Sequence, residues 1–64
     1  MKRIESTETL EELGKRVFKS SLKYKIYDES RDYVVEIYKN NEKIYEFVCH
    51  KKLCQAFLNY AFEF

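Results

Sequence analysis

The residues in this sequence whose chemistry is most distinctive are Cys49, His50 and Cys54. Thiolates and imidazole are good zinc ligands, but a closed structural site needs a fourth ligand and usually pairs its cysteines more closely. Cys49 and Cys54 also lack the two-residue gap of disulfide oxidoreductases. We therefore expect two small buried hydrophobic residues and an exposed histidine at a helix start, with no metal and no cofactor.

Catalysis has few other candidate residues. A covalent mechanism needs a nucleophile beside a base, and only His50 and the pair Ser20 and Ser21 offer these groups. The sequence holds one glycine, so it has no glycine-rich loop for phosphates. We expect a protein that is not an enzyme and has no small-molecule substrate.

The length of 64 residues predicts a single domain, residues 1–64, because two halves would each be too small to bury a core. Hydrophobic residues make up 45% of the chain, which favours a folded protein despite 36% charged residues. A core of this size gives about 3–5 kcal/mol, and small domains often gain more by self-association. These considerations predict a homodimer.

The elements that must position these residues form an α+β fold, a three-stranded antiparallel meander flanked by an N-terminal and a C-terminal helix. Thr9 and Glu12 fit a capping box, and apolar spacing predicts a helix over 9–19. Gly14 is its weak point, since glycine costs about 1 kcal/mol inside a helix and could end it early. Alternating apolar residues predict strands over 21–27, 33–39 and 43–49, and the last helix spans 51–62.

The register of the strands follows from the turns expected between them. A turn over 28–32 pairs Ile26 with Tyr33 and sets Lys23 opposite Glu36. Asn40 and Asn41 tolerate positive φ and begin the second turn. A two-residue turn would place Ile44, Glu46 and Val48 on the core face of the third strand, whereas a three-residue loop would place Tyr45, Phe47 and Cys49 there. We favour the second, because it buries no carboxylate.

Two apolar surfaces exceed what so small a fold can bury. The last helix has polar residues only along one narrow stripe, so its apolar part is wider than one sheet face requires. The outer face of the sheet also carries apolar side chains. Exposed apolar surface marks interfaces. We expect the protein interface to include Val34, Tyr38, Ile44, Tyr60, Phe62 and Phe64.

Charge is distributed unevenly along the chain, although the net charge is only +1. The stretch 13–27 has basic residues and no acid, whereas 28–49 is mainly acidic. The basic stretch supports an alternative function, nucleic-acid binding, because tyrosines interleave with the cations. Its candidate residues are Lys15, Arg16, Lys19, Lys23 and Lys25.

No apolar run is long enough for a signal peptide or a membrane span, which predicts a cytoplasmic protein without a membrane partner. The order helix, three-stranded meander, helix resembles that of small phage-encoded inhibitors of host nucleases, anti-CRISPR proteins among them, in size and layout only. This resemblance transfers no functional residue. The combined expectation is a homodimeric inhibitor or adaptor that binds a larger protein and is encoded by a phage or mobile element.

Overall fold

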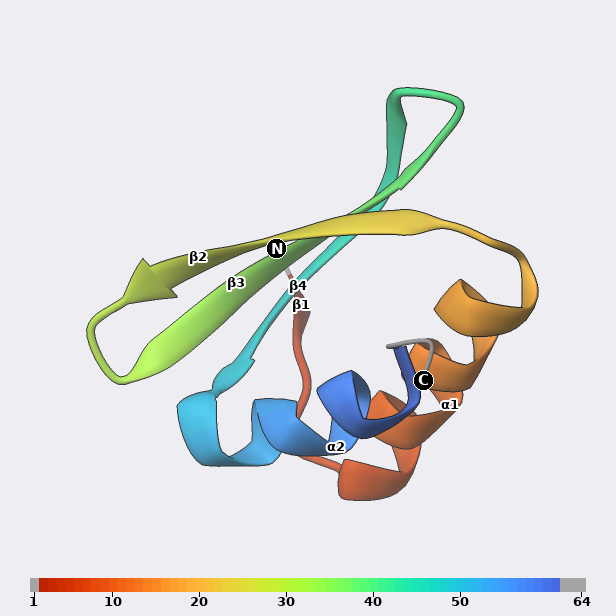
Figure 1. The fold of residues 1–64 in the computed structure, drawn as a ribbon. Coiled ribbons are helices and arrows are strands. Elements are labelled where there is room, and N and C mark those ends of the chain that lie inside the picture. The colour runs from red at the N-terminus through yellow and green to blue at the C-terminus, as the bar shows by residue number, and fades with distance from the viewer. Residues whose placement is uncertain (1, 62–64) are drawn as a thin grey trace.

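The computed structural model describes residues 2–61. Two helices and a four-stranded sheet form an α+β fold (Figure 1). The elements follow in the order β1 (Lys2–Arg3), α1 (Thr7–Lys19), β2 (Lys23–Glu29), β3 (Asp32–Lys39), β4 (Glu42–His50) and α2 (Lys51–Ala61). The predicted order of helix, three-stranded meander and helix is confirmed, and a short N-terminal strand is added to it.

Helix α1 begins earlier than the sequence predicts. Ser6 is the N-cap, and its hydroxyl oxygen accepts a hydrogen bond of 3.3 Å from the backbone N–H of Thr9. This cap satisfies one of the N–H groups that every helix leaves unpaired at its start. The helix then continues through Gly14 to Lys19, so the prediction of Thr9 as the cap is wrong and the glycine does not end the helix.

The hairpin of β2 and β3 corrects the predicted register by two residues. Its turn contains only Ser30 and Arg31, with Ser30 at φ 63°, and the strands extend to the pair Glu29 and Asp32. Ile26 therefore lies opposite Val35 and not Tyr33. Lys23 correspondingly faces Tyr38, and Lys25 takes the place opposite Glu36.

Strand β4 has the facing that the sequence favours, but this facing results from a β-bulge that the sequence does not predict. The expected three-residue loop is wrong, because Asn40 and Asn41, both at positive φ, form a two-residue turn. Such a turn alone would place Ile44, Glu46 and Val48 on the core face. The register shifts after Tyr38, so that Lys43 pairs with Tyr38 while Tyr45 pairs with Ile37. Ile44 is the extra residue of this bulge. Beyond it, Phe47 and Cys49 point into the core.

Both helices cover the same face of the sheet (Figure 1). The core between them consists of buried side chains from the helices and from the inner sheet face: Ile4, Leu10, Val17, Val35, Ile37, Phe47, Cys49, Cys54, Phe57 and Ala61. Phe57 is at its centre, in edge-to-face contact with Tyr24 and Phe47 at centroid distances of 5.3 and 5.6 Å. Within residues 2–61, no helix lies against the opposite face of the sheet.

The wide apolar face of α2 is explained by its two neighbours. Cys54 and Phe57 face the sheet, while the same helix packs along α1, where Gly14 meets the backbone at Phe57 and Ala61. This surplus of apolar surface is therefore largely used inside the chain.

Strand β1 lies outside the prediction, since two residues carry no periodic signal. It pairs in parallel with β4, with Lys2 opposite Phe47 and Arg3 opposite Val48. The next residue, Ile4, is buried, and its N–H donates to the carbonyl of Val48 at 2.9 Å.

Candidate functional site

The uncovered outer face of the sheet is the candidate site, and an apolar row crosses its middle. The register places Tyr27, Val34 and Val48 next to one another on β2, β3 and β4. Tyr27 is 43% exposed, and the two valines are partly buried by their neighbours on the sheet. Val34 lies at the centre, so a partner that covers this row would remove three aligned apolar side chains from water.

On one side of the row, a polar cluster surrounds the carboxylate of Glu36. The Tyr38 hydroxyl donates to it at 2.7 Å, and the Lys43 ammonium lies 3.4 Å from its other oxygen. Lys43 also donates to Glu46 at 2.7 Å, and the ammonium of Lys25 lies over the Tyr38 ring, 5.0 Å from its centroid. The cluster holds these side chains in fixed positions beside the apolar row.

The electrostatics of this cluster favour the ionised carboxylate. The hydrogen bond from Tyr38 is the main cause that lowers the pKa of Glu36 below its ordinary value of 4.5, and the charge of Lys43 adds to it against the effect of burial. The same contact raises the pKa of Tyr38 above 10.0. Glu36 therefore stays charged over the physiological range.

On the other side of the row, Arg3 and Asp32 form a two-pronged ion pair. The two guanidinium nitrogens of Arg3 lie 3.0 and 3.1 Å from the two carboxylate oxygens. This hydrogen bond is the main cause that lowers the pKa of Asp32. His50 is the cross-strand neighbour of Asp32 on β4. The outer face thus has an apolar centre between two charged borders, the arrangement found in protein interfaces.

The predicted interface residues do not lie on one surface. Val34 and Tyr38 share the outer face, as expected. Ile44 is 50% exposed but lies on the helix side, where it lines a groove of about 300 Å³ with Leu13, Arg16, Val17, Leu22, Ile37 and Tyr45. Tyr60 is 41% exposed beside α1, with the ammonium of Lys15 5.0 Å from its ring centroid. Phe62 and Phe64 lie outside the described residues.

The expected interface omits two members of the apolar row. Alternation assigns Tyr27 to the outer face, and the favoured facing of the third strand assigns Val48 to it, but neither pattern shows that the two residues align with Val34. Their alignment with Val34 depends on the turn at Ser30 and on the bulge at Ile44. Neither irregularity has a signal in the alternation of apolar residues.

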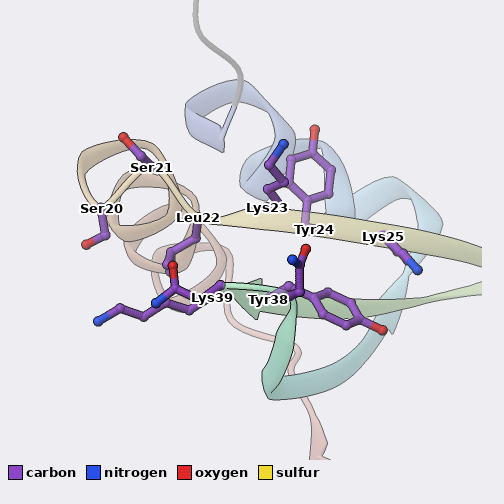
Figure 2. A pocket seen from close by; sticks show the side chains of 10 residues that line it. Ser20, Ser21, Leu22, Lys23, Tyr24, Lys25, Tyr38 and Lys39 are labelled. Atoms are coloured by element: carbon purple, nitrogen blue, oxygen red, sulfur yellow. The ribbon is translucent and has the colours of Figure 1, made fainter.

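The predicted basic residues are gathered at one end of the molecule but on different faces. Lys15, Arg16 and Lys19 lie on the second half of α1, whereas Lys23 and Lys25 follow on β2. Between β2 and the end of β3 is a hollow of about 560 Å³, to which Lys39 also contributes. Figure 2 shows the side chains of Lys23, Lys25 and Lys39 pointing in different directions around this hollow. They do not converge on one point as ligands of a single phosphate would.

The residues with metal-ligand chemistry are separated by burial. Cys49 and Cys54 are both free thiols in the core, in hydrogen-bonding contact with each other. Burial raises the pKa of Cys54 to about 12. His50 is turned the other way, and its Nδ1 accepts the N–H of Lys52 at 3.2 Å, which caps the start of α2. Across residues 2–61, no three His, Cys, Asp or Glu side chains are grouped as metal ligands would be.

Neither α1 nor α2 has the length and apolar character that crossing a lipid bilayer requires. Comparison with known proteins gives no relative from which a function could be carried over: no family model, no curated protein and no solved structure matches this chain.

Proposed function

We propose that this chain is a non-catalytic protein-binding module, an inhibitor or adaptor, that applies the outer face of its sheet to a larger protein. The observation that carries the proposal is the row of Tyr27, Val34 and Val48 on a sheet face that neither helix covers. Three aligned apolar residues on a rigid sheet offer a partner a surface that is already in its binding shape. Little conformational freedom is lost on binding, which favours affinity.

The charged borders supply orientation. Lys25 and Lys43 alternate with Glu36 and Glu46 on one side, and Arg3 pairs with Asp32 on the other, so each border presents both signs of charge. Such mixed borders discriminate between partners and fix the direction of docking more than they add affinity. A protein with a complementary pattern around an apolar recess fits this face.

The test compares captured partners from the native cell with matched variants. Val34→Lys places a charge at the centre of the apolar row, where it remains solvated in the free chain but becomes buried in a complex. Lys52→Glu changes an exposed residue in the first turn of α2 and serves as the control. The proposal expects a specific protein that binds the unchanged chain and Lys52→Glu but not Val34→Lys. Equal capture by both variants would refute it, once circular dichroism shows that both are folded.

Nucleic-acid binding is the second candidate function, supported by the basic residues at the end of the molecule formed by α1 and β2. The lining of the hollow in Figure 2 contains Lys23, Lys25 and Lys39 and no acidic residue. Phosphate contacts make binding strongly dependent on salt. Binding of labelled single-stranded and duplex DNA at two salt concentrations tests this function. A steep dependence that disappears in Lys23→Glu with Lys39→Glu would support it, and absence of binding at low salt would exclude it.

A further inference from the structure

Strand β2 forms one edge of the sheet that residues 2–61 build. The strand order β1-β4-β3-β2 leaves Lys23–Glu29 with a neighbour on one side only, among the strands that the structure describes. The opposite edge is partly covered, since β1 pairs with β4 at Phe47 and Val48. A strand edge presents a row of N–H and C=O groups that can pair with another strand.

The turn between β2 and β3 determines which backbone groups lie on that free edge. In a two-residue hairpin the residues that flank the turn, here Glu29 and Asp32, form a hydrogen-bonded pair, and such pairs alternate along the ladder. Odd-numbered residues of β2 therefore direct their N–H and C=O groups to β3. Tyr24, Ile26 and Asp28 direct theirs outward, away from the sheet.

We propose that β2 pairs antiparallel with β2 of a second copy of this chain, centred on Ile26, and joins two four-stranded sheets into one. In this register Ile26 lies opposite itself and Tyr24 opposite Asp28. All of these residues have outward backbone groups, so the hydrogen-bonded ladder is continuous. The side chains are complementary as well, because Lys23 lies opposite Glu29 of the second copy, twice in the dimer.

The middle positions agree with this pairing. Lys25 lies opposite Tyr27 of the second copy, and a lysine over a tyrosine ring is an attractive arrangement that Lys25 already makes with Tyr38 in its own chain. On the inner face, the meeting of the two Ile26 side chains continues the core rows that run through Val35 and Phe47 in each copy. The pairing thus extends the apolar core across the junction.

Other registers are less favourable. A shift by one residue sets outward backbone groups against inward ones and breaks the ladder. A shift by two in one direction places Lys25 opposite itself. A shift by two in the other direction pairs Lys25 with Glu29 but places Ile26 opposite Asp28, and either shift loses the Lys23–Glu29 pairs and shortens the ladder. A parallel arrangement brings Lys23 beside Lys23 and Glu29 beside Glu29. The order of charges along β2, basic first and acidic last, therefore favours antiparallel pairing, and the length of the ladder favours the register centred on Ile26.

Dimerisation at β2 goes beyond the proposed function and does not depend on it. The two surfaces share Tyr27 and Lys25, but the dimer is built on the backbone edge of β2, whereas the larger partner binds the outer face centred on Val34. Pairing at β2 leaves Val34 uncovered and makes the outer faces of the two copies continuous. Each partner protein would then meet a doubled surface. Val34→Lys is expected to lose the larger partner and keep the dimer, so the two proposals can fail separately.

The test is a measurement of mass in solution by sedimentation from about 1 to about 100 µM, where a dimer in equilibrium changes its mass with concentration. Lys23→Glu and Glu29→Lys each create two like-charge pairs in the proposed dimer. Both residues are exposed in the single chain, so neither change disturbs its core. Each variant alone is expected to dimerise roughly tenfold more weakly than the unchanged chain.

The decisive sample is an equal mixture of the two variants. In the mixed dimer, the glutamate introduced by Lys23→Glu faces the lysine introduced by Glu29→Lys. At the other end, the unchanged Glu29 of the first variant faces the unchanged Lys23 of the second, so both charge pairs are attractive. The mixture is therefore expected to recover the mass of the unchanged chain. As a control, Lys52→Glu mixed with Glu42→Lys has the same net charges away from β2 and is expected to dimerise alone as well as mixed.

Two results would overturn the proposal. The first is an unchanged chain that remains a monomer over the whole concentration range. The second is a dimer that Lys23→Glu and Glu29→Lys leave as stable as before, because such a dimer forms through another surface.

Discussion

Gly14 of α1 lies directly against the carbonyl oxygen of Phe57 in α2, and any side-chain carbon at this position would overlap that oxygen. A Cβ atom at position 14 would also lie 3.1 Å from the Cβ of Tyr60 and 3.2 Å from the backbone N of Ala61. The helices approach this closely because glycine lacks a side chain. The position explains why a residue that weakens helices lies in the middle of one.

Gly14→Ala is expected to destabilise the fold, although alanine favours helix formation by about 1 kcal/mol. The overlap is with backbone atoms of α2, which cannot rotate away, so the helices must separate and the core loosens. We expect the free energy of unfolding to fall by about 2 kcal/mol. Urea unfolding measures this, with Thr9→Ala, an exposed position of α1, as the control. A stabilised Gly14→Ala variant would show that the helices are not in close contact.

Burial of Cys54 gives the stability of the protein a dependence on alkaline pH. Its pKa is raised from an ordinary 9.0 to about 12, so above pH 9 the unfolded chain releases a proton that the folded chain retains. Stability is therefore complete below about pH 9 and falls as the pH rises towards 12. The fall between about pH 8 and pH 10 in urea unfolding is expected to be smaller in Cys54→Ala. An equal fall in both proteins would mean that the thiol is not buried.

The cluster around Glu36 is expected to respond to loss of the Tyr38 hydroxyl. That hydrogen bond is the main cause that lowers the pKa of Glu36, so Tyr38→Phe should raise it towards 4.5. The contribution of the cluster to stability is present above about pH 4.5 and is lost as the pH falls through the lowered pKa. Carboxyl carbon chemical shifts measured during an acid titration report this pKa directly. Lys43→Met should shift it in the same direction, and no change in either variant would contradict the observed contacts.

Much of the fold could be predicted from the spacing of apolar residues. The alternation in β2 and β3 and the helical spacing of Leu10 and Val17 correspond to inner faces that the core requires. The hairpin ends could not be predicted, because Asp28 and Asp32 are residues typical of turns. They belong to strands here because distant cations hold them: Lys51 lies 2.7 Å from Asp28, and Arg3 pairs with Asp32.

The candidate site could be predicted only in part for the same reason. Val34 and Tyr38 follow from alternation in one strand, but their neighbours depend on how three strands align. The sequence links a two-residue turn to an outward Phe47 and a three-residue loop to a buried Phe47. The bulge at Ile44 allows the structure to combine the two-residue turn with a buried Phe47. The wide apolar face of α2 is buried against α1 because the helices pack closely at Gly14. In the sequence alone, Gly14 indicates only a residue that weakens a helix.

The most direct test of the central claim, that both helices cover one face of the sheet and leave the other open, uses the four valines as internal probes. Val17 and Val35 are buried at 2% and 0% exposure, whereas Val34 and Val48 lie on the outer face. Methyl relaxation is measured with a soluble paramagnetic agent in a dilute sample. Strong enhancement is expected at Val34 and Val48, and little at Val17 and Val35. Equal protection of Val34 and its sequence neighbour Val35 would contradict it.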